Sequence, residues 1–236
     1  MDMVLILYIN DLLLLGEDLS KIEDVKCQLG KLYQIKNLGP ASSYLGIWIT
    51  RDQNIQAIWI DQQAYIENTL KRFELLNENS TNTPLHAGIQ LDKSEEPVAL
   101  DTKTYYQQII GTLIYAAIGT RPDITFAAMR LSQFNNNPTK EHSYQVCKIH
   151  TQRHKRTQNQ VWWKFKCWVN WILRFRLGWN RDDHHSTSGH VFLMANGAIS
   201  WASQQQKMVA LSVGEAEYME LASTGQQVAW LRSFSR

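Results

Sequence analysis

The apolar and polar positions at the start of the chain predict a hairpin. Residues 3–16 form an apolar run that is interrupted only by Asn10 and Asp11. Two short apolar runs on either side of a polar pair are typical of buried strands joined by a tight turn, because Asn and Asp tolerate the dihedral angles of such turns. The pattern therefore predicts a hairpin that holds a carboxylate, Asp11, at its tip.

The blocks that follow predict helices and a second hairpin. Residues 18–32 carry apolar side chains at three- and four-residue spacing, which indicates an amphipathic helix packed on the first hairpin. Residues 44–50 and 55–60 are rich in strand-forming side chains and flank a polar turn, which favours a hairpin. Asp61 then caps a predicted helix that ends near Phe73.

The middle of the chain predicts a linker followed by two helices. Residues 77–104 are polar and contain two prolines, which is typical of a long loop. One helical pattern covers the apolar positions from Ile109 to Ile114. A second pattern begins at Pro122, a residue that suits the first turn of a helix.

The C-terminal residues predict strands and then a long helix. Residues 191–202 contain two strand patterns around Asn196-Gly197, a strong hairpin signal, and residues 207–211 indicate another strand. Residues 212–215 match a capping box, which opens a helix. One face of this helix is predicted to be apolar and to contain Tyr218, Leu221, Ala222, Gly225 and Ala229.

Composition places the chain among globular proteins. With 236 residues and 44% hydrophobic content it can form one large core or two small ones, and its net charge of +2 does not by itself identify a nucleic-acid binder. Its three cysteines are widely spaced, which fits a reducing compartment. The apolar N-terminal run is shorter than the roughly 20 residues that span a bilayer. We expect an intracellular protein of the cytoplasm or nucleus, neither secreted nor embedded in a membrane.

Two carboxylates have both a structural and a chemical interpretation. Asp11 either forms the turn or binds Mg²⁺, which takes one or two carboxylates together with substrate phosphates. Glu215 is explained by the capping box, whereas Glu217 is not. Glu217 either favours the helix dipole from the first turn or binds a metal beside a sheet.

A basic and aromatic segment also has two interpretations. Residues 143–181 contain nine basic residues, no acidic residue and five tryptophans. The segment 148–181 is typical of a module that binds single-stranded nucleic acid through phosphate pairing and base stacking. The side chains proposed for this binding are Trp162, Trp163, Lys164 and Lys166.

The alternative is that residues 149–180 are read in the wrong frame, because they have little sustained helix or strand period. Residues 175–180 can be encoded by codons that, read one base forward, give Ser-Asp-Trp-Ala-Gly.

A series of short boxes resembles the Pol polyprotein of copia-type LTR retrotransposons, from late reverse transcriptase into early ribonuclease H. Tyr8-Ile9-Asn10-Asp11 resembles the polymerase Tyr-X-Asp-Asp box. The family also has a Ser-Asp-Trp-Ala-Gly-like stretch before its Ser-Thr-Ser-Gly box, where the shifted frame supplies one. The further boxes are Leu-Gly-Pro at 38–40, Tyr-Leu-Gly-Ile at 44–47, Ala-Tyr-Ile at 64–66, Leu-Lys-Arg-Phe at 70–73, Gly-Thr-Leu-Ile-Tyr at 111–115, Thr-Arg-Pro-Asp-Ile at 120–124, Leu-Ser-Gln-Phe at 131–134, Ser-Thr-Ser-Gly at 186–189, Ile-Ser-Trp at 199–201, Val-Ala-Leu-Ser at 209–212 and Glu-Ala-Glu-Tyr at 215–218.

The resemblance implies an α+β fold divided into four parts. Residues 1–92 correspond to the palm hairpin and thumb remnant of a reverse transcriptase, and residues 93–148 to helices of the connection. Residues 149–180 form the frame-disrupted segment. Residues 181–236 correspond to an incomplete ribonuclease H-like domain.

The resemblance also implies chemistry. Both activities of the family use Mg²⁺ held by several carboxylates and act on RNA and DNA. Asp11 matches one metal ligand of the polymerase, and Asn10 stands where the family has Asp. Tyr8 belongs to the same box and is expected to contact the nucleic acid. Glu217 matches one ribonuclease H ligand.

The remaining ligands of both metal sites are missing, so we expect a truncated, catalytically inactive remnant that does not bind Mg²⁺ productively. The alternative is the nucleic-acid-binding module 148–181, and a third interpretation is a gene product that never accumulates as folded protein.

Overall fold

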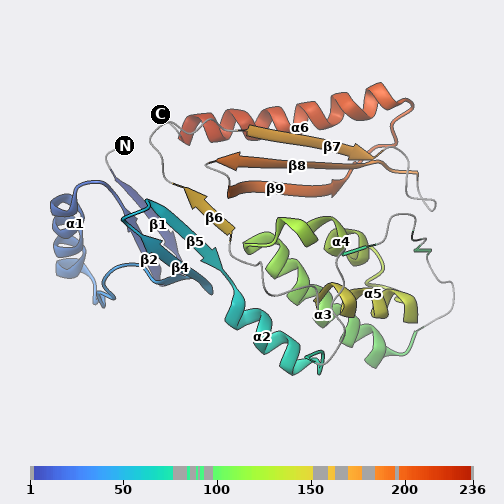
Figure 1. Cartoon of the computed structure of the whole chain (residues 1–236), viewed down its shortest axis with the longest axis horizontal. Helices are drawn as coiled ribbons and strands as arrows, with labels where there is room; N and C mark the ends of the chain where they lie inside the picture. Colours follow the sequence, from blue (N-terminus) through green and yellow to red (C-terminus); the bar gives the residue numbers. More distant parts are fainter. Residues whose placement is uncertain are drawn as a thin grey trace.

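The computed structural model confirms the α+β prediction: three antiparallel sheets stand beside a group of packed helices (Figure 1). The sheets have two, four and three strands. Among the described residues no helix is both long and apolar enough to cross a membrane. The structure describes residues 3–76, 84–85, 89, 91–92, 98–150, 159–162, 170–176, 184–194 and 197–234.

The N-terminal hairpin forms as predicted, with a small shift of its turn. Strand β1 (Val4–Tyr8) pairs with β2 (Asp11–Leu15) along its whole length. The two turn residues are Ile9, which has a positive φ of 51°, and Asn10. Asp11 is therefore the first residue of β2 rather than part of the turn.

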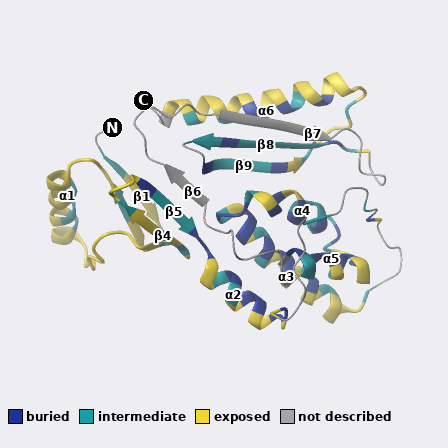
Figure 2. Ribbon diagram, in the orientation of Figure 1, coloured by how far each residue is buried: buried dark blue, intermediate teal, exposed yellow. Residues whose placement is uncertain are grey.

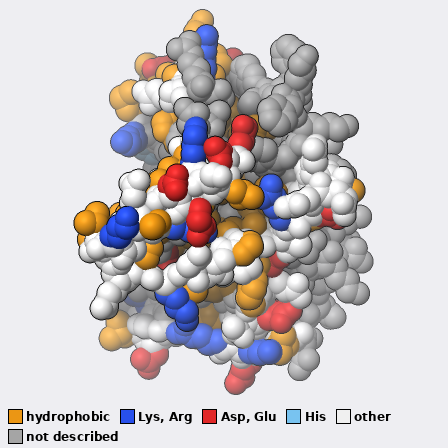
Figure 3. Space-filling view, turned by 90° about the vertical axis from the view of Figure 1, so that its left-hand side faces the viewer, with side chains coloured by type: hydrophobic (Ala, Val, Ile, Leu, Met, Phe, Trp, Pro, Cys, Tyr) orange, Lys and Arg blue, Asp and Glu red, His pale blue; other side chains and the backbone are white. Residues whose placement is uncertain are grey.

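The predicted burial of this hairpin is wrong. No residue of β1 or β2 is buried, and the Leu7 side chain is 64% exposed. Helix α1 (Leu19–Leu32) lies beside the hairpin (Figure 2), and although it has no buried residue, the predicted inward positions Ile22, Val25 and Leu29 are half-buried. The main contacts of the two hairpin strands among the described elements are with each other. Apolar side chains accordingly reach the surface among charged ones on the side viewed in Figure 3.

The second predicted hairpin is confirmed within a four-stranded sheet. The strand order is β3-β4-β5-β6, all antiparallel. Strand β6 comes from the segment that the sequence leaves without a clear period, and it extends the free edge of β5. The strands are β3 (Ser43–Tyr44), β4 (Ile47–Asp52), β5 (Ala57–Asp61) and β6 (Asn159–Trp162).

Helices α2 to α5 enclose the main hydrophobic core (Figure 2). Asp61 starts α2 as predicted, since its Oδ1 accepts the Gln63 backbone N–H at 3.1 Å. Three of these helices, α2, α3 and α4, are predicted from the sequence, although α3 is longer than its predicted pattern, whereas α5 is not predicted. The helices are α2 (Gln63–Arg72), α3 (Leu100–Gly119), α4 (Pro122–Ser132) and α5 (Lys140–His150).

The predicted linker contributes to this core. Leu91 lies outside any helix or strand but is buried among the core side chains, and α3 begins at Leu100, so the prediction of a loop over residues 77–104 is wrong from Leu100 onward. In the centre of the core the Tyr106 hydroxyl donates to the Leu131 carbonyl oxygen at 2.9 Å. Burial raises the pKa of Tyr106, so this hydroxyl stays a hydrogen-bond donor at physiological pH.

The C-terminal sheet has a helix on each face. Strands β7 (Asn170–Arg176), β8 (Thr187–Met194) and β9 (Gly197–Gln205) pair in that order. Helix α6 (Val213–Phe234) covers one face, and α4 lies against the other (Figure 1). The predicted hairpin is confirmed as β8 and β9.

Two details of this part differ from the prediction. Residues 207–211 do not form a strand, because they lead directly into the cap of α6, where the Leu211 N–H donates to Glu215 at 2.7 Å. The predicted apolar face of α6 points outward, and Tyr218 is 76% exposed. The side chains that α6 buries are Ala216, Glu220 and Thr224.

Candidate catalytic carboxylates and nucleic-acid contacts

Asp11 stands at an exposed hairpin tip. The strand pairing sets its backbone opposite Tyr8, and Asn10 precedes it in the turn. All three side chains are exposed, and Tyr8 retains 54% of its surface. The hairpin therefore presents one carboxylate, one amide and one phenol to solvent at the same end of the sheet.

The two glutamates that follow the α6 cap have opposite environments. The cap forms as predicted, with the Glu215 N–H donating to Ser212 Oγ at 3.2 Å. Glu217 is exposed, whereas Glu220 is only 3% exposed. Glu220 accepts a hydrogen bond from Thr224 Oγ1 at 3.1 Å, and its Oε1 lies 3.7 Å from His190 Nδ1 on β8.

Glu220 had not been singled out from the sequence. The sequence feature that could have indicated the burial of Glu220 is the four-residue spacing of Ala216, Glu220 and Thr224. This spacing places one small, one acidic and one hydroxyl side chain on a single helix face. A polar face of this kind is unexpected toward a sheet. It becomes reasonable once His190 is known to lie beneath it.

The first turn of α6 lies beside the end of β7. Gln206 Nε2 donates both to Ser188 Oγ at 2.8 Å and to the Ala216 carbonyl oxygen at 2.9 Å. Ser188 is paired with Phe175 in β7. The structure thus places the backbone of Glu217 near the C-terminal end of that strand.

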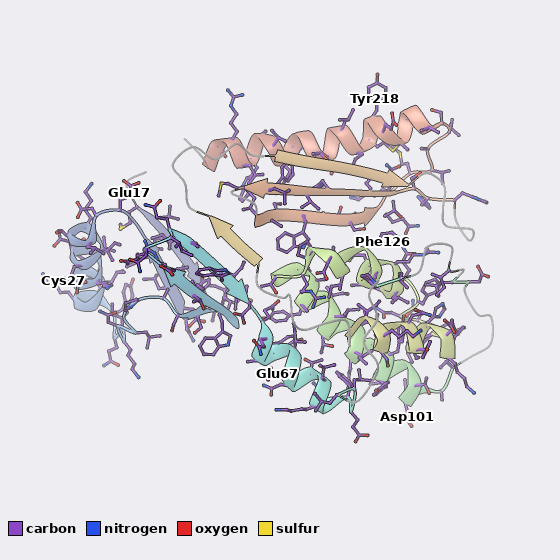
Figure 4. The ribbon with its side chains drawn as sticks, viewed as in Figure 1. Glu17, Cys27, Glu67, Asp101, Phe126 and Tyr218 are labelled. Atoms are coloured by element: carbon purple, nitrogen blue, oxygen red, sulfur yellow. The ribbon has the colours of Figure 1, made fainter. Side chains whose placement is uncertain are left out.

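Asp11 and Glu217 lie in different parts of the molecule. Asp11 belongs to β2 and Glu217 to the first turns of α6, and Figure 1 shows these two elements in different parts of the molecule, while Tyr218, next to Glu217, is labelled on the far side of α6 in Figure 4. Within the described ranges no three His, Cys, Asp or Glu side chains gather in a way that could hold a metal ion. A two-metal site needs several carboxylates around one position, so the described residues do not fit such a site.

The aromatic and basic candidates lie mostly beyond the described residues. Trp162 is the last residue of β6, where its backbone pairs with that of Ala57. Trp163, Lys164 and Lys166 lie outside the described part of the chain.

A hollow that the sequence did not predict lies between α4 and the C-terminal sheet. Its volume is about 350 Å³. Gln133 on α4 and Gln205 on β9 join its two sides through a hydrogen bond of 3.2 Å. The residues that line it are Phe126, Met129, Arg130, Ser132, Gln133, Thr187, Ser203, Gln204 and Gln205.

Comparison with known proteins identifies the class of the N-terminal part. The family described as reverse transcriptase (RNA-dependent DNA polymerase) matches residues 1–87. These residues hold the Asp11 hairpin, helix α1, three strands of the four-stranded sheet (β3, β4 and β5) and helix α2. No solved structure matches the chain.

Three relatives are similar over nearly all of the chain. The Pol polyprotein from transposon TNT 1-94 of Nicotiana tabacum is 33% identical over 98% of the chain. Those from transposons RE1 and RE2 of Arabidopsis thaliana are 29% and 27% identical over 97% of it. The chain spans only 18%, 16% and 16% of their respective lengths. The chain belongs to the Pol polyprotein family of copia-type retrotransposons.

Proposed function

We propose that this chain is a reverse transcriptase and ribonuclease H remnant that performs neither reaction on its own. In this proposal residues 1–92 are the end of a palm hairpin with a thumb, and residues 93–148 are the connection. Residues 149–180 are a frame-disrupted segment, and residues 181–236 are the first part of a ribonuclease H-like domain. The observation that carries the proposal is the isolation of each candidate carboxylate among the described residues.

For polymerisation the hairpin tip is short of negative charge. Reverse transcriptases generally use a divalent metal, which holds the triphosphate and activates the primer hydroxyl. Asp11 contributes one carboxylate, whereas Asn10 contributes a neutral amide oxygen. Both side chains are exposed at the tip of a hairpin whose strands contain no buried residue. One exposed carboxylate does not fix two Mg²⁺ ions.

Hydrolysis of an RNA strand needs a second carboxylate beside Glu217. In this proposal that missing carboxylate belongs near the C-terminal end of β7. Because the first turn of α6 lies beside that end, a carboxylate there would be close to Glu217. The chain as written has Phe175 and Arg176 at these positions. The shifted frame replaces them with a stretch that contains Asp, which supports the interpretation of a frame disruption.

The proposal is tested by assays of the purified chain with Mg²⁺. Primer extension on an RNA template and cleavage of an RNA–DNA hybrid should both be absent, while a complete retroviral reverse transcriptase serves as positive control. The Asn10→Asp variant should remain inactive, because one added carboxylate does not complete the site. Mg²⁺-dependent activity of the unmodified chain in either assay would overturn the proposal.

The frame interpretation has its own test. The genomic nucleotide sequence of residues 149–180 should encode an Asp-Trp pair in the neighbouring frame. A neighbouring frame without that pair contradicts a frame disruption and leaves the evolved binding segment as the better interpretation.

A second candidate function is nucleic-acid binding by residues 148–181. Its support is the concentration of basic and aromatic residues without any acidic one, together with the backbone pairing that ties β6 to the sheet edge. Binding of single-stranded RNA should weaken as salt rises. It should weaken further when Trp162, Trp163, Lys164 and Lys166 are replaced by Ala.

The control for this second function replaces exposed residues of similar type elsewhere. Lys21 and Lys31 on α1 and Tyr33 after it are all exposed. Replacing them by Ala should leave the affinity for RNA unchanged. Equal losses in both sets of variants would show nonspecific charge attraction and contradict a binding module.

A further inference from the structure

The hollow between α4 and β9, here called the α4–β9 groove, has one wall made by a single face of α4. Phe126, Met129, Arg130 and Gln133 are three or four residues apart, so their side chains leave the helix on the same side. Figure 4 labels Phe126 between α4 and the C-terminal sheet. Its side chain is 38% exposed. This wall therefore combines a partly exposed aromatic ring with a guanidinium one helical turn away.

The other wall comes from the edge of the C-terminal sheet. Thr187 on β8 and Gln205 on β9 are cross-strand partners, so their side chains lie on one face of the sheet. The hydrogen bond of 3.2 Å from Gln133 Nε2 to Gln205 Oε1 ties this wall to α4. Trp201 Nε1 donates to the Ala117 carbonyl oxygen at 2.8 Å and holds the same face of the sheet on the end of α3.

The arginine of the groove, Arg130, is held in place by the two residues that come directly after α4. Its guanidinium carbon lies 5.4 Å from the centre of the Phe134 ring, and its Nη1 donates to Gln133 Oε1. An arginine that is already stacked on a ring and hydrogen-bonded loses little further freedom when it meets an anion. The described lining residues include this one basic side chain and no acidic one.

This set of side chains selects for one class of ligand. The described lining has no carboxylate, imidazole or thiolate to bind a metal cation, and its single guanidinium offers little to a peptide that carries several acidic groups. A nucleotide offers a phosphate for the guanidinium and a base face for Phe126. The volume of about 350 Å³ lies within the range of small-ligand sites.

We propose that the α4–β9 groove binds one nucleotide of a single-stranded nucleic acid. Phe126 stacks on the base and Arg130 pairs with its phosphate, while the hydrogen-bonded pair Gln133 and Gln205 bounds the groove beside the base. This contact is separate from residues 148–181. It rests on the proposed function only in assuming that the chain is a nucleic-acid protein.

The test measures binding of a short fluorescein-labelled single-stranded oligonucleotide to the full chain at several salt concentrations. Phe126→Ala should weaken binding by about 5- to 100-fold, as expected for loss of one base stack. Arg130→Gln should weaken it and reduce the magnitude of the salt slope by about one, because one phosphate contact is lost. Adenosine monophosphate should compete with the oligonucleotide.

Matched variants separate this contact from general effects. Tyr33→Ala removes an exposed ring after α1, and Lys71→Gln removes an exposed positive charge from α2, so both should bind like the unmodified chain. Phe126→Tyr and Arg130→Lys keep the ring and the charge, and should retain most of the affinity. Thermal unfolding of each variant shows whether it is folded.

Three results would overturn the inference. An unmodified chain that binds no oligonucleotide removes its premise. Binding with unchanged affinity after Phe126→Ala and Arg130→Gln rejects the groove while leaving nucleic-acid binding elsewhere intact. Competition by polyglutamate as strong as that by adenosine monophosphate would assign the groove to acidic peptides instead.

Discussion

At the scale of single residues, Gly46 depends on its lack of a side chain in two ways. It has a positive φ of 76°, and a Cβ placed there would lie 2.6 Å from the Tyr115 hydroxyl oxygen. That hydroxyl donates to the Leu45 carbonyl oxygen at 2.8 Å, which ties the β3–β4 turn to α3. The residue therefore serves both the turn and its contact with the helical core.

Gly46→Ala should destabilise the chain by more than the approximately 1 kcal/mol that a left-handed alanine costs. Gly39→Ala is the matched control, because Gly39 has a φ of 79° but no atom within 4 Å of its added Cβ. Chemical denaturation of both variants measures the difference. Tyr115→Phe combined with Gly46→Ala should recover part of the excess, and equal losses in the two glycine variants would contradict the contact.

His142 is a residue whose protonation state the fold selects. Its ring is buried, stacks on Phe134 with 3.9 Å between ring centres, and accepts the Thr139 N–H at Nδ1 over 2.9 Å. Burial lowers the pKa of His142, since a charged imidazole would lose its hydration, and the nearby Arg130 also lowers it. The native structure therefore contains the neutral ring.

This burial predicts a loss of stability in mild acid. The unfolded chain binds the proton near the ordinary histidine pKa of about 6.5, before the native state does. Stability should be complete above that pH and fall, by up to about 1.4 kcal/mol per pH unit, until the lower native pKa is passed. Denaturation between neutral pH and pH 5 measures the slope. His142→Asn, which keeps an acceptor for Thr139, should flatten it, whereas the exposed His184→Gln should not.

At the scale of elements, the face of helix α6 that the apolar pattern predicts to be buried is the exposed one. Tyr218, Leu221 and Val228 lie on its exposed side. The side toward the sheet carries Glu220, with Thr224 as hydrogen-bond donor and His190 nearby. Polar partners from the sheet make this face the buried one.

Glu220→Ala should destabilise the chain by about 1–3 kcal/mol, because the buried Thr224 hydroxyl loses its acceptor and His190 loses the neighbouring carboxylate. Glu217→Ala, three residues earlier on an exposed face, should change stability by less than about 0.5 kcal/mol. Urea denaturation of the two variants gives the comparison. A larger effect at Glu217 would mean that the opposite face of α6 is buried in solution.

At the scale of the whole molecule, the C-terminal sheet is joined to the helical core by few specific contacts. The most direct is the hydrogen bond from Trp201 on β9 to the Ala117 carbonyl at the end of α3. The Gln133–Gln205 pair is a second. The β1–β2 hairpin, by contrast, has no such anchor among the described residues, and isolated hairpins of this size are marginally stable.

Trp201→Phe should retain most of the apolar packing but lose the N–H donor, at a cost of about 0.5–1.5 kcal/mol. Trp48→Phe is the control, since Trp48 is 50% exposed and lies on β4 of the four-stranded sheet. Guanidinium denaturation followed by fluorescence and by circular dichroism measures both stability and cooperativity. Identical stability of the Trp201 variant and the parent would exclude this hydrogen bond as a stabilising contact.

Local pattern alone was enough to locate most helices and strands of this protein. Residues within one or two turns of each other specify the first hairpin, the β8–β9 hairpin and the cap of α6. They also specify helices α2, α3 and α4, apart from the position where α3 begins. Asp11 was likewise predicted at the tip of the hairpin, and the observed turn is shifted from the predicted one by one residue. These features depend on side-chain periodicity and on caps, which neighbouring residues specify.

Tertiary packing alone decided which surfaces are covered. It left the apolar hairpin exposed, buried Glu220 in place of Tyr218, brought Leu91 into the core and formed the α4–β9 groove. It also separated Asp11 from Glu217. Periodicity marks a face as apolar, but burial requires a partner surface that is distant in the chain, and only the folded arrangement supplies or withholds it.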